Sequence, residues 1–210
     1  LIEYAVEQGL AKNIQLKYNT NLTNVPDRLV KTWSEFKDIR FNLSIDGIGE
    51  LNDYIRYPSK WRAVEKNYQK ILNLNETSAS KMSYVIDIHV TIQNSNIMQL
   101  GDILDYFLPG DGHDWEGNHV FLNVLQHPEQ HNIRALPPDL KTIAVERIAH
   151  RLDDPRLLQI KGMVDYMMAE DWSHLFPKFI DETQQLDKMR GQDIGQVIPE
   201  FKPYLNKKVT

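Results

Sequence analysis

Segments with helical periodicity alternate with segments with strand periodicity over about the first 130 residues. Four runs that alternate apolar and polar residues, or are rich in β-branched residues, predict strands at 14–20, 39–45, 84–92 and 119–125. Apolar residues at helical spacing predict helices at 1–12, 26–37, 61–74 and 96–108. Strands that alternate with helices of this length form crossover units, so the pattern predicts an α/β fold with a parallel sheet.

The pattern changes after Pro128, where strand alternation ends. Helical spacing predicts one helix at 139–152, a second that ends near Ala169 and a third that ends at Arg190. We therefore expect two parts, an α/β part at 1–130 and a helical C-terminal region at 131–210. The chain opens on residues with helical spacing, and we expect a further strand upstream of Leu1 in a longer protein.

Composition and charge argue against several classes of partner and site. The 210 residues carry 24 Lys and Arg against 29 Asp and Glu, a net charge of −5, which disfavours nucleic acid as a partner. No apolar run approaches the ~20 residues that span a bilayer, so we expect no membrane partner. The 210 residues include no cysteine, which excludes disulfides and thiolate metal sites within them.

Histidines gather in one stretch, at positions 113, 119, 127 and 131. The pair at 127 and 131 superficially resembles a zinc-binding helix motif. Pro128 denies the helix that would bring both rings to one face. We therefore expect no metal site in this stretch.

Hydrogen-bonding side chains follow each predicted strand. These residues are Asn21, then Ser44, Asp46 and Arg56, then Asn94, and finally Gln126. Because parallel strands end at one edge of the sheet, the set suits a polar small molecule with hydroxyls and a carboxylate. Arg56 can pair with a carboxylate through two hydrogen bonds. The alternative is that Asp46-Gly47 is only a turn and that Asn21 is only a cap.

Several of these motifs resemble one family when they are taken in order. Ser44-Ile45-Asp46-Gly47, Asn52-Asp53 and Arg56 resemble the fourth-strand segment of radical S-adenosylmethionine enzymes of the sulfatase-maturase, SPASM and twitch group. Residues 18–22 resemble the third-strand segment, with Leu22 where the family often has glycine. Residues 90–96 and 121–128 resemble its fifth and sixth strands, and the tail resembles that of twitch-type members.

The resemblance implies an incomplete (β/α)6 partial barrel, strands three to six, that binds S-adenosyl-L-methionine. By motif position, Ser44 would contact the ribose, Asp46 would support the strand end and Arg56 would meet the methionine carboxylate. Asn94 would lie near the nucleoside, and Leu125 and Gln126 would lie against the adenine. Asn21 is counted with these cofactor-binding residues.

The resemblance also implies an enzyme that reductively cleaves this cofactor to a 5'-deoxyadenosyl radical, which takes a hydrogen from a substrate. The Cys-x3-Cys-x2-Cys segment that holds the [4Fe-4S] cluster is absent from the 210 residues, as is the Gly-Gly-Glu segment. We expect both upstream of Leu1, so that this chain is the inactive downstream portion of a cytoplasmic enzyme. Its substrate is unknown, and a peptide is one candidate.

Two alternatives remain open on sequence grounds. One is a cluster-free protein that binds a nucleoside or a peptide. The other is an unrelated α/β interaction domain whose helical tail forms the partner surface.

Overall fold

The computed structural model describes residues 1–74, 83–110 and 118–205. Its centre is a sheet of four parallel strands in the order β1-β2-β3-β4. The strands are β1 (Gln15–Thr20), β2 (Asp38–Ser44), β3 (Ser83–Ile92) and β4 (His119–Val124). The predicted α/β class and parallel sheet are confirmed, because each connection crosses back over the sheet before the next strand pairs.

One face of the sheet is apolar and covered. Its side chains alternate with polar ones along each strand, and Phe41, Leu43, Ile88 and Val90 on this face are fully buried. The connecting helices α2 (Asp27–Trp33), α4 (Trp61–Leu72) and α6 (Leu100–Phe107) follow the first three strands. The Trp33 ring packs edge to face on Phe41 at 4.9 Å, which fixes α2 on this face.

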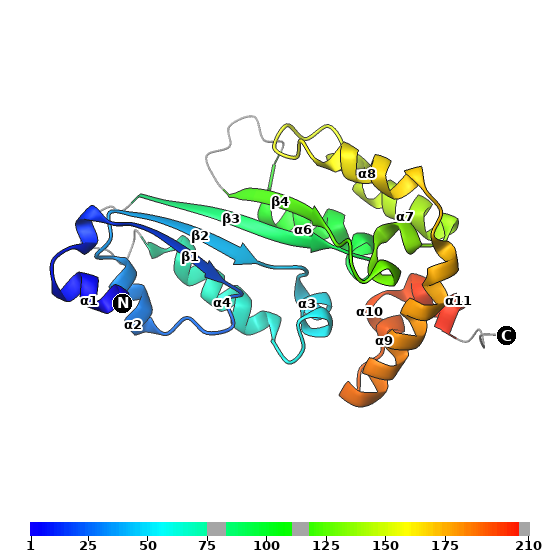
Figure 1. Ribbon diagram of the computed structural model, residues 1–210, viewed down its shortest axis with the longest axis horizontal. Helices are drawn as coiled ribbons and strands as arrows, with labels where there is room; N and C mark the ends of the chain where they lie inside the picture. Colours follow the sequence, from blue (N-terminus) through cyan, green and yellow to red (C-terminus); the bar gives the residue numbers. More distant parts are fainter. Residues whose placement is uncertain (75–82, 111–117, 206–210) are drawn as a thin grey trace.

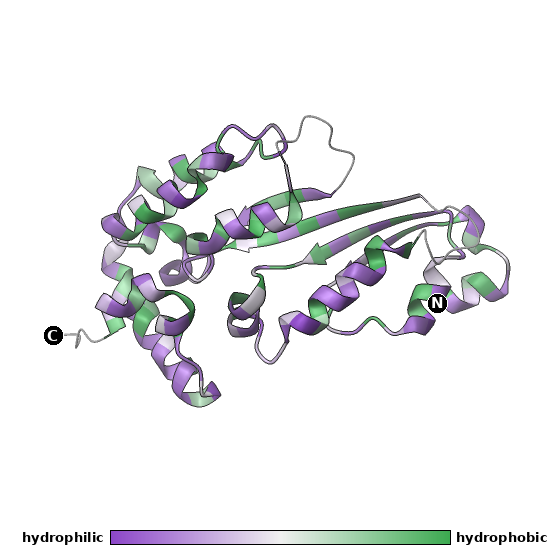
Figure 2. Cartoon of the chain, turned by 180° about the vertical axis from the view of Figure 1, so that it is seen from behind, coloured by the Kyte–Doolittle hydropathy of each residue, from purple (hydrophilic) through white to green (hydrophobic). Residues whose placement is uncertain are grey.

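The other face of the sheet is polar. Register places Asn19, Asn42, Asp87 and His119 in one row across all four strands. Asp87 is 4% exposed, and its carboxylate pairs with Arg40 at 2.5 Å and with His119 at 3.2 Å. Figure 2 shows hydrophobic and hydrophilic residues alternating along the strands and around the helices.

The N-terminal helix is shorter than predicted. Helix α1 covers Ile2–Glu7, and the 3-10 turn η1 covers Ala11–Asn13. Gly9 between them has φ of 67°, a left-handed conformation that stops the predicted helix 1–12 early. The 3-10 turn η2 (Ile97–Gln99) likewise begins the segment that was predicted as one helix at 96–108.

Helix α3 (Gly49–Ile55) was not predicted, because Asp46-Gly47 and Gly49 indicate a turn. It is the next helix after β2 and packs against α4 and α10 (Ile194–Val197). A Cβ at Gly47 would lie 3.0 Å from the backbone nitrogen of Asn52, so this close approach requires glycine.

The C-terminal region is helical, as predicted. Its helices are α7 (Pro138–Ile148), α8 (Ile160–Ala169), α9 (Phe176–Arg190), α10 (Ile194–Val197) and α11 (Lys202–Leu205). Two 3-10 turns lead from β4 to α7, η3 (Glu129–His131) and η4 (Ile133–Ala135), and three lie between the helices, η5 (Ala149–Arg151), η6 (Ser173–Leu175) and η7 (Pro199–Phe201). Figure 1 shows that the strands point toward these helices, with α3, α9 and α10 beyond the strand ends.

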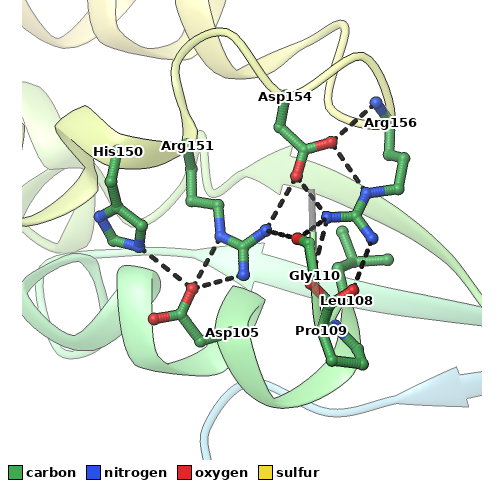
Figure 3. A network of polar contacts seen from close by, with 8 residues as sticks. All are labelled: Asp105, Leu108, Pro109, Gly110, His150, Arg151, Asp154 and Arg156. Atoms are coloured by element: carbon green, nitrogen blue, oxygen red, sulfur yellow. Dashed lines mark hydrogen bonds and ion pairs between the residues drawn. The ribbon is translucent and has the colours of Figure 1, made fainter. Parts of the chain in front are cut away.

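A charged network holds the segment after α7 against the end of α6 (Figure 3). Arg151 donates to Asp105 at 2.7 Å and to Asp154 at 2.9 Å. Arg156 donates to Asp154 at 2.8 Å and to the carbonyl of Leu108 at 3.1 Å. The Arg156 hydrogen bond is the main reason that the pKa of Asp154 falls to about 2. The two arginines and the two aspartates of this network neutralise one another and hold the two segments together.

Candidate functional site

The site lies at the carboxyl edge of the sheet, where the segments after β1 and β2 and helix α3 meet. A pocket of about 700 Å³ opens there. Ser44, at the end of β2, lines it together with Asn52 and Arg56 from α3 and the turn that follows. The remaining lining residues are Asn21, Thr23, Ile55, Tyr57, Pro58, Ser59, Lys60 and Ala63. The volume is typical of a small-molecule site.

Asp46 ties the neighbouring strand ends together. Its side chain is largely buried, and one oxygen accepts a hydrogen bond from the backbone N–H of Thr91 at 2.8 Å. The other oxygen lies 2.6 Å from a guanidinium nitrogen of Arg56. The Asp46 carbonyl accepts from the side-chain amide of Asn96 at 3.0 Å. Asp46 therefore holds β2, β3 and Arg56 in register, and is more than a turn residue.

The pocket wall holds hydrogen-bond donors without acceptors. Asn52 is 2% exposed, and its side-chain Nδ2 has no partner. The Nε of Arg56 is also buried without a hydrogen bond, although the same guanidinium pairs with Asp46 through Nη2. A buried donor without an acceptor costs about 1–3 kcal/mol, and both donors belong to residues that line the pocket. Ser44 adds an exposed hydroxyl.

Asn21 occupies the rim of the same pocket but has a local structural role. Its side-chain oxygen accepts from the backbone N–H of Thr23 at 3.2 Å and from the Thr23 hydroxyl at 2.8 Å. The next residue, Leu22, is fully buried and has φ of 61°, in the left-handed region that favours glycine.

Asn94 follows β3 on the same edge, outside the pocket lining. It is fully buried, its backbone N–H donates to the carbonyl of His131 at 3.0 Å, and its Nδ2 donates to the carbonyl of Gln130 at 2.8 Å. Its Oδ1 has no partner. Such an acceptor is a place for a ligand or water donor.

Leu125 and Gln126 follow β4. The backbone N–H of Leu125 donates to the carbonyl of Ile92 at 2.9 Å, so this segment stays tied to β3. The exposed side chain of Gln126 accepts from the hydroxyl of Tyr166 at 3.0 Å. The structure thus gathers Asn21, Ser44 and Arg56 at one pocket, with Asp46 outside the lining and paired to Arg56. It places Asn94, Leu125 and Gln126 farther along the same edge.

Sequence reasoning missed three parts of this region. Lys60 lines the pocket and lies 3.5 Å from Asp53, a pairing that depends on the unpredicted helix α3. Asn52 was named only within the Asn52-Asp53 motif, and its place in the pocket wall was not predicted. Asp87 and its partners Arg40 and His119 were missed, although a single carboxylate within the apolar run 84–92 was a usable signal.

Neither a metal-binding cluster nor a membrane-spanning helix is present among the described residues. Within residues 1–74, 83–110 and 118–205, no cluster of three or more His, Asp or Glu side chains is arranged to hold a metal ion. His113 of the histidine stretch lies outside the described residues. No helix in the described part of the chain has the length and apolar character needed to cross a membrane.

Comparisons of the chain with protein-family models, with curated proteins and with solved structures find no match. The function therefore has to be inferred from the residues of the site.

Proposed function

We propose that the carboxyl edge of the sheet binds S-adenosyl-L-methionine, and that the chain is the downstream portion of a radical S-adenosylmethionine enzyme with strands three to six of a partial barrel. The single observation that carries the proposal is the pocket at this edge, which Ser44, Asn52 and Arg56 line together, with Arg56 held by Asp46. Donors at Asn52 and Arg56 lack acceptors, and the acceptor at Asn94 lacks a donor. This cofactor offers a carboxylate at one end and nucleoside donors at the other.

The sheet gives the ligand a suitable setting. Parallel sheets are generally covered on both faces, yet one face here carries a row of polar residues, as the inner wall of a site would. Neighbouring strands lie about 4.8 Å apart, so the ends of β2 and β4 are separated by about 10 Å. We propose that the amino-acid end of the ligand lies at Arg56 and that its adenine lies beside Leu125.

A backbone feature also supports the resemblance. Leu22 stands where the family often has glycine, and it adopts a positive φ of 61°. A position that requires this conformation is one where glycine is favoured in related chains.

The described residues would act by binding and orientation. Arg56, held by Asp46, would bind the carboxylate, with Ser44 and Asn52 as further donors. Asn94 would lie near the nucleoside, and the chain at Leu125 and Gln126 would lie against the adenine ring. When bound beside a reduced cluster, the cofactor supplies the radical chemistry that removes a hydrogen atom from the substrate.

The [4Fe-4S] cluster does not fit this chain, because the 210 residues include no cysteine to hold it. The enzymatic part of the proposal therefore requires thiolate ligands from residues outside this sequence. That lack of cysteine favours a second candidate, a cluster-free protein that binds a nucleoside or a peptide at the same edge. Both candidates place a ligand at Ser44, Arg56 and Asn94.

Isothermal titration of the chain with S-adenosylhomocysteine and with adenosine tests the binding proposal. Arg56→Gln should weaken S-adenosylhomocysteine about tenfold or more, since one charge-assisted hydrogen bond is worth about 1.5–3 kcal/mol. Adenosine, which has no carboxylate, should bind the variant as it binds the wild type. Arg28→Gln is the matched control, because Arg28 also pairs with a carboxylate, at 3.1 Å, but on α2. Equal affinities of wild type and Arg56→Gln for S-adenosylhomocysteine would contradict the proposal.

A further inference from the structure

Helices α9 and α10 contact helix α3 through hydrogen bonds and packing. The hydroxyl of Tyr54 donates to the Oδ1 of Asp187 on α9 at 2.7 Å. The Oδ2 of Asp187 accepts from the backbone N–H of Ile194, the first residue of α10, at 2.9 Å. Tyr54 and Asp187 are 7% and 9% exposed, so this contact is removed from solvent. One carboxylate thus joins three helices.

Two further contacts flank this carboxylate. The side-chain amide of Gln192 donates to the carbonyl of Asp53 at 3.2 Å. The guanidinium of Arg190 lies 5.2 Å from the centre of the Tyr57 ring, and Tyr57 lines the pocket. The segment from Asp187 to Ile194 therefore contacts α3 and the turn after it on both sides of Arg56.

Helix α3 depends on such contacts for its orientation. It is only seven residues long, and no side chain caps its first turn. Helices this short are marginal in water on their own, so packing decides where α3 points. On the sheet side, the Arg56–Asp46 pair restrains it. On the side of the C-terminal helices, the buried restraint is Asp187, and Gln192 adds a second contact.

We propose that Asp187 is a positioning residue for the ligand pocket, and that it acts through Tyr54 to hold α3 so that Arg56 stays directed at Asp46 and at the bound carboxylate. The inference rests on the proposed function for its ligand, but the orientation of Arg56 can be measured without one. Because coupling between two sites is reciprocal, carboxylate binding at Arg56 would also stabilise the docking of α9 and α10.

The first test uses Tyr54→Phe in the full chain without ligand, read by the NMR signal of the Arg56 Nε–H. This variant removes only the hydroxyl that contacts Asp187. The Arg56 signal should shift or broaden, because α3 loses its restraint on that side. Glu182→Gln is the matched control, since Glu182 lies on the same helix but contacts Gln130 and His131. An unchanged Arg56 signal in folded Tyr54→Phe would overturn the inference.

Gln192→Ala is the second variant, to be used if Tyr54→Phe loses its near-ultraviolet circular dichroism. It removes the contact with Asp53 and leaves the buried Tyr54–Asp187 pair in place. Because that pair still holds α3, the Arg56 signal should stay close to its wild-type position, and a large shift would overturn the inference by placing the restraint on Gln192 rather than on Asp187.

The ligand measurement separates this inference from the proposed function. Tyr54→Phe should weaken S-adenosylhomocysteine about fivefold or more, while the affinity for adenosine stays unchanged. Equal loss for both ligands would indicate general damage to the fold and contradict a positioning role. Failure of the wild-type chain to bind either ligand would reject the proposed function, and the Arg56 signal would still decide the role of Asp187.

Discussion

Asp46, which lies between β2 and α3, and Arg56, which directly follows α3, face each other at 2.6 Å. The Asp46 side chain is 8% exposed and that of Arg56 is 32% exposed, so the pair lies at the boundary between the core and the pocket. The Asp46 carboxylate also accepts a hydrogen bond from the backbone N–H of Thr91 on β3, so it belongs to the sheet as well as to the site. Asp46 therefore contributes to the stability of the fold and also positions the Arg56 guanidinium at the pocket.

Asp46→Asn should lower the free energy of unfolding by about 1–3 kcal/mol, which urea denaturation would measure. The amide oxygen can still accept from Thr91, but Arg56 loses its counter-charge. Partial exposure of Arg56 keeps the loss below that of a fully buried pair. Asp153→Asn is the control, since Asp153 pairs with Lys161 at an exposed position and its loss should be clearly smaller. Equal losses in the two variants would be evidence against a special role for Asp46.

Phe41→Ala should destabilise the chain by about 3–5 kcal/mol, because it removes a fully buried ring from the covered face of β2. Asn42→Ala, one residue along, should cost about 1 kcal/mol or less, because it removes only the side-chain hydrogen bond to Asn19 on the polar face. Thermal or urea unfolding of the two variants tests which face is covered. A larger loss from Asn42→Ala would reverse the assignment of the faces.

Asp154 should make the chain sensitive to acid. Its pKa is lowered from 3.8 to about 2 in the folded state, chiefly by the hydrogen bond from Arg156. A depressed pKa stabilises the fold above the unfolded value of 3.8, and this contribution is lost as the pH falls through about 2. The loss should be on the order of 2 kcal/mol, and Asp154→Asn should lack it. Unfolding curves between pH 5 and pH 2 that run parallel for the two proteins would disagree with this prediction.

The enzymatic part of the proposed function makes a prediction about the gene. A reading frame continuous with the Leu1 codon should encode Cys-x3-Cys-x2-Cys and Gly-Gly-Glu, because the 210 residues offer no thiolate. Sequencing about 400 bases upstream would show this. An in-frame stop codon directly before Leu1 would reject the cluster and favour the cluster-free binding protein.

The strands and their parallel arrangement could be predicted from the sequence, because each strand carries local alternation and each crossover has helical spacing. The strand predicted at 39–45 differs from β2 by one residue at each end. Helix α3 could not be predicted, since glycines at 47 and 49 locally indicate a turn. Its helical form comes from packing against α4 and α10.

The candidate site could be predicted only in part. Polar residues after parallel strands indicate a common edge, and the structure places Asn21, Ser44 and Arg56 at one pocket there. The Asp46–Arg56 pair depends on α3, and the Tyr54–Asp187 contact joins residues 133 positions apart. Neither has a local signal. Radical chemistry and S-adenosylmethionine binding stay predictions, supported by the resemblance and by the unpaired polar groups.

The most direct test of the central claim is an NMR titration of the chain with S-adenosylhomocysteine. The account predicts that perturbed backbone signals gather at Ser44, Asn52, Arg56, Asn94, Leu125 and Gln126. Signals from α1 and from the Asp154 network should stay in place. Perturbations confined to other surfaces, or no perturbation at millimolar ligand, would contradict a cofactor site at the carboxyl edge of the sheet.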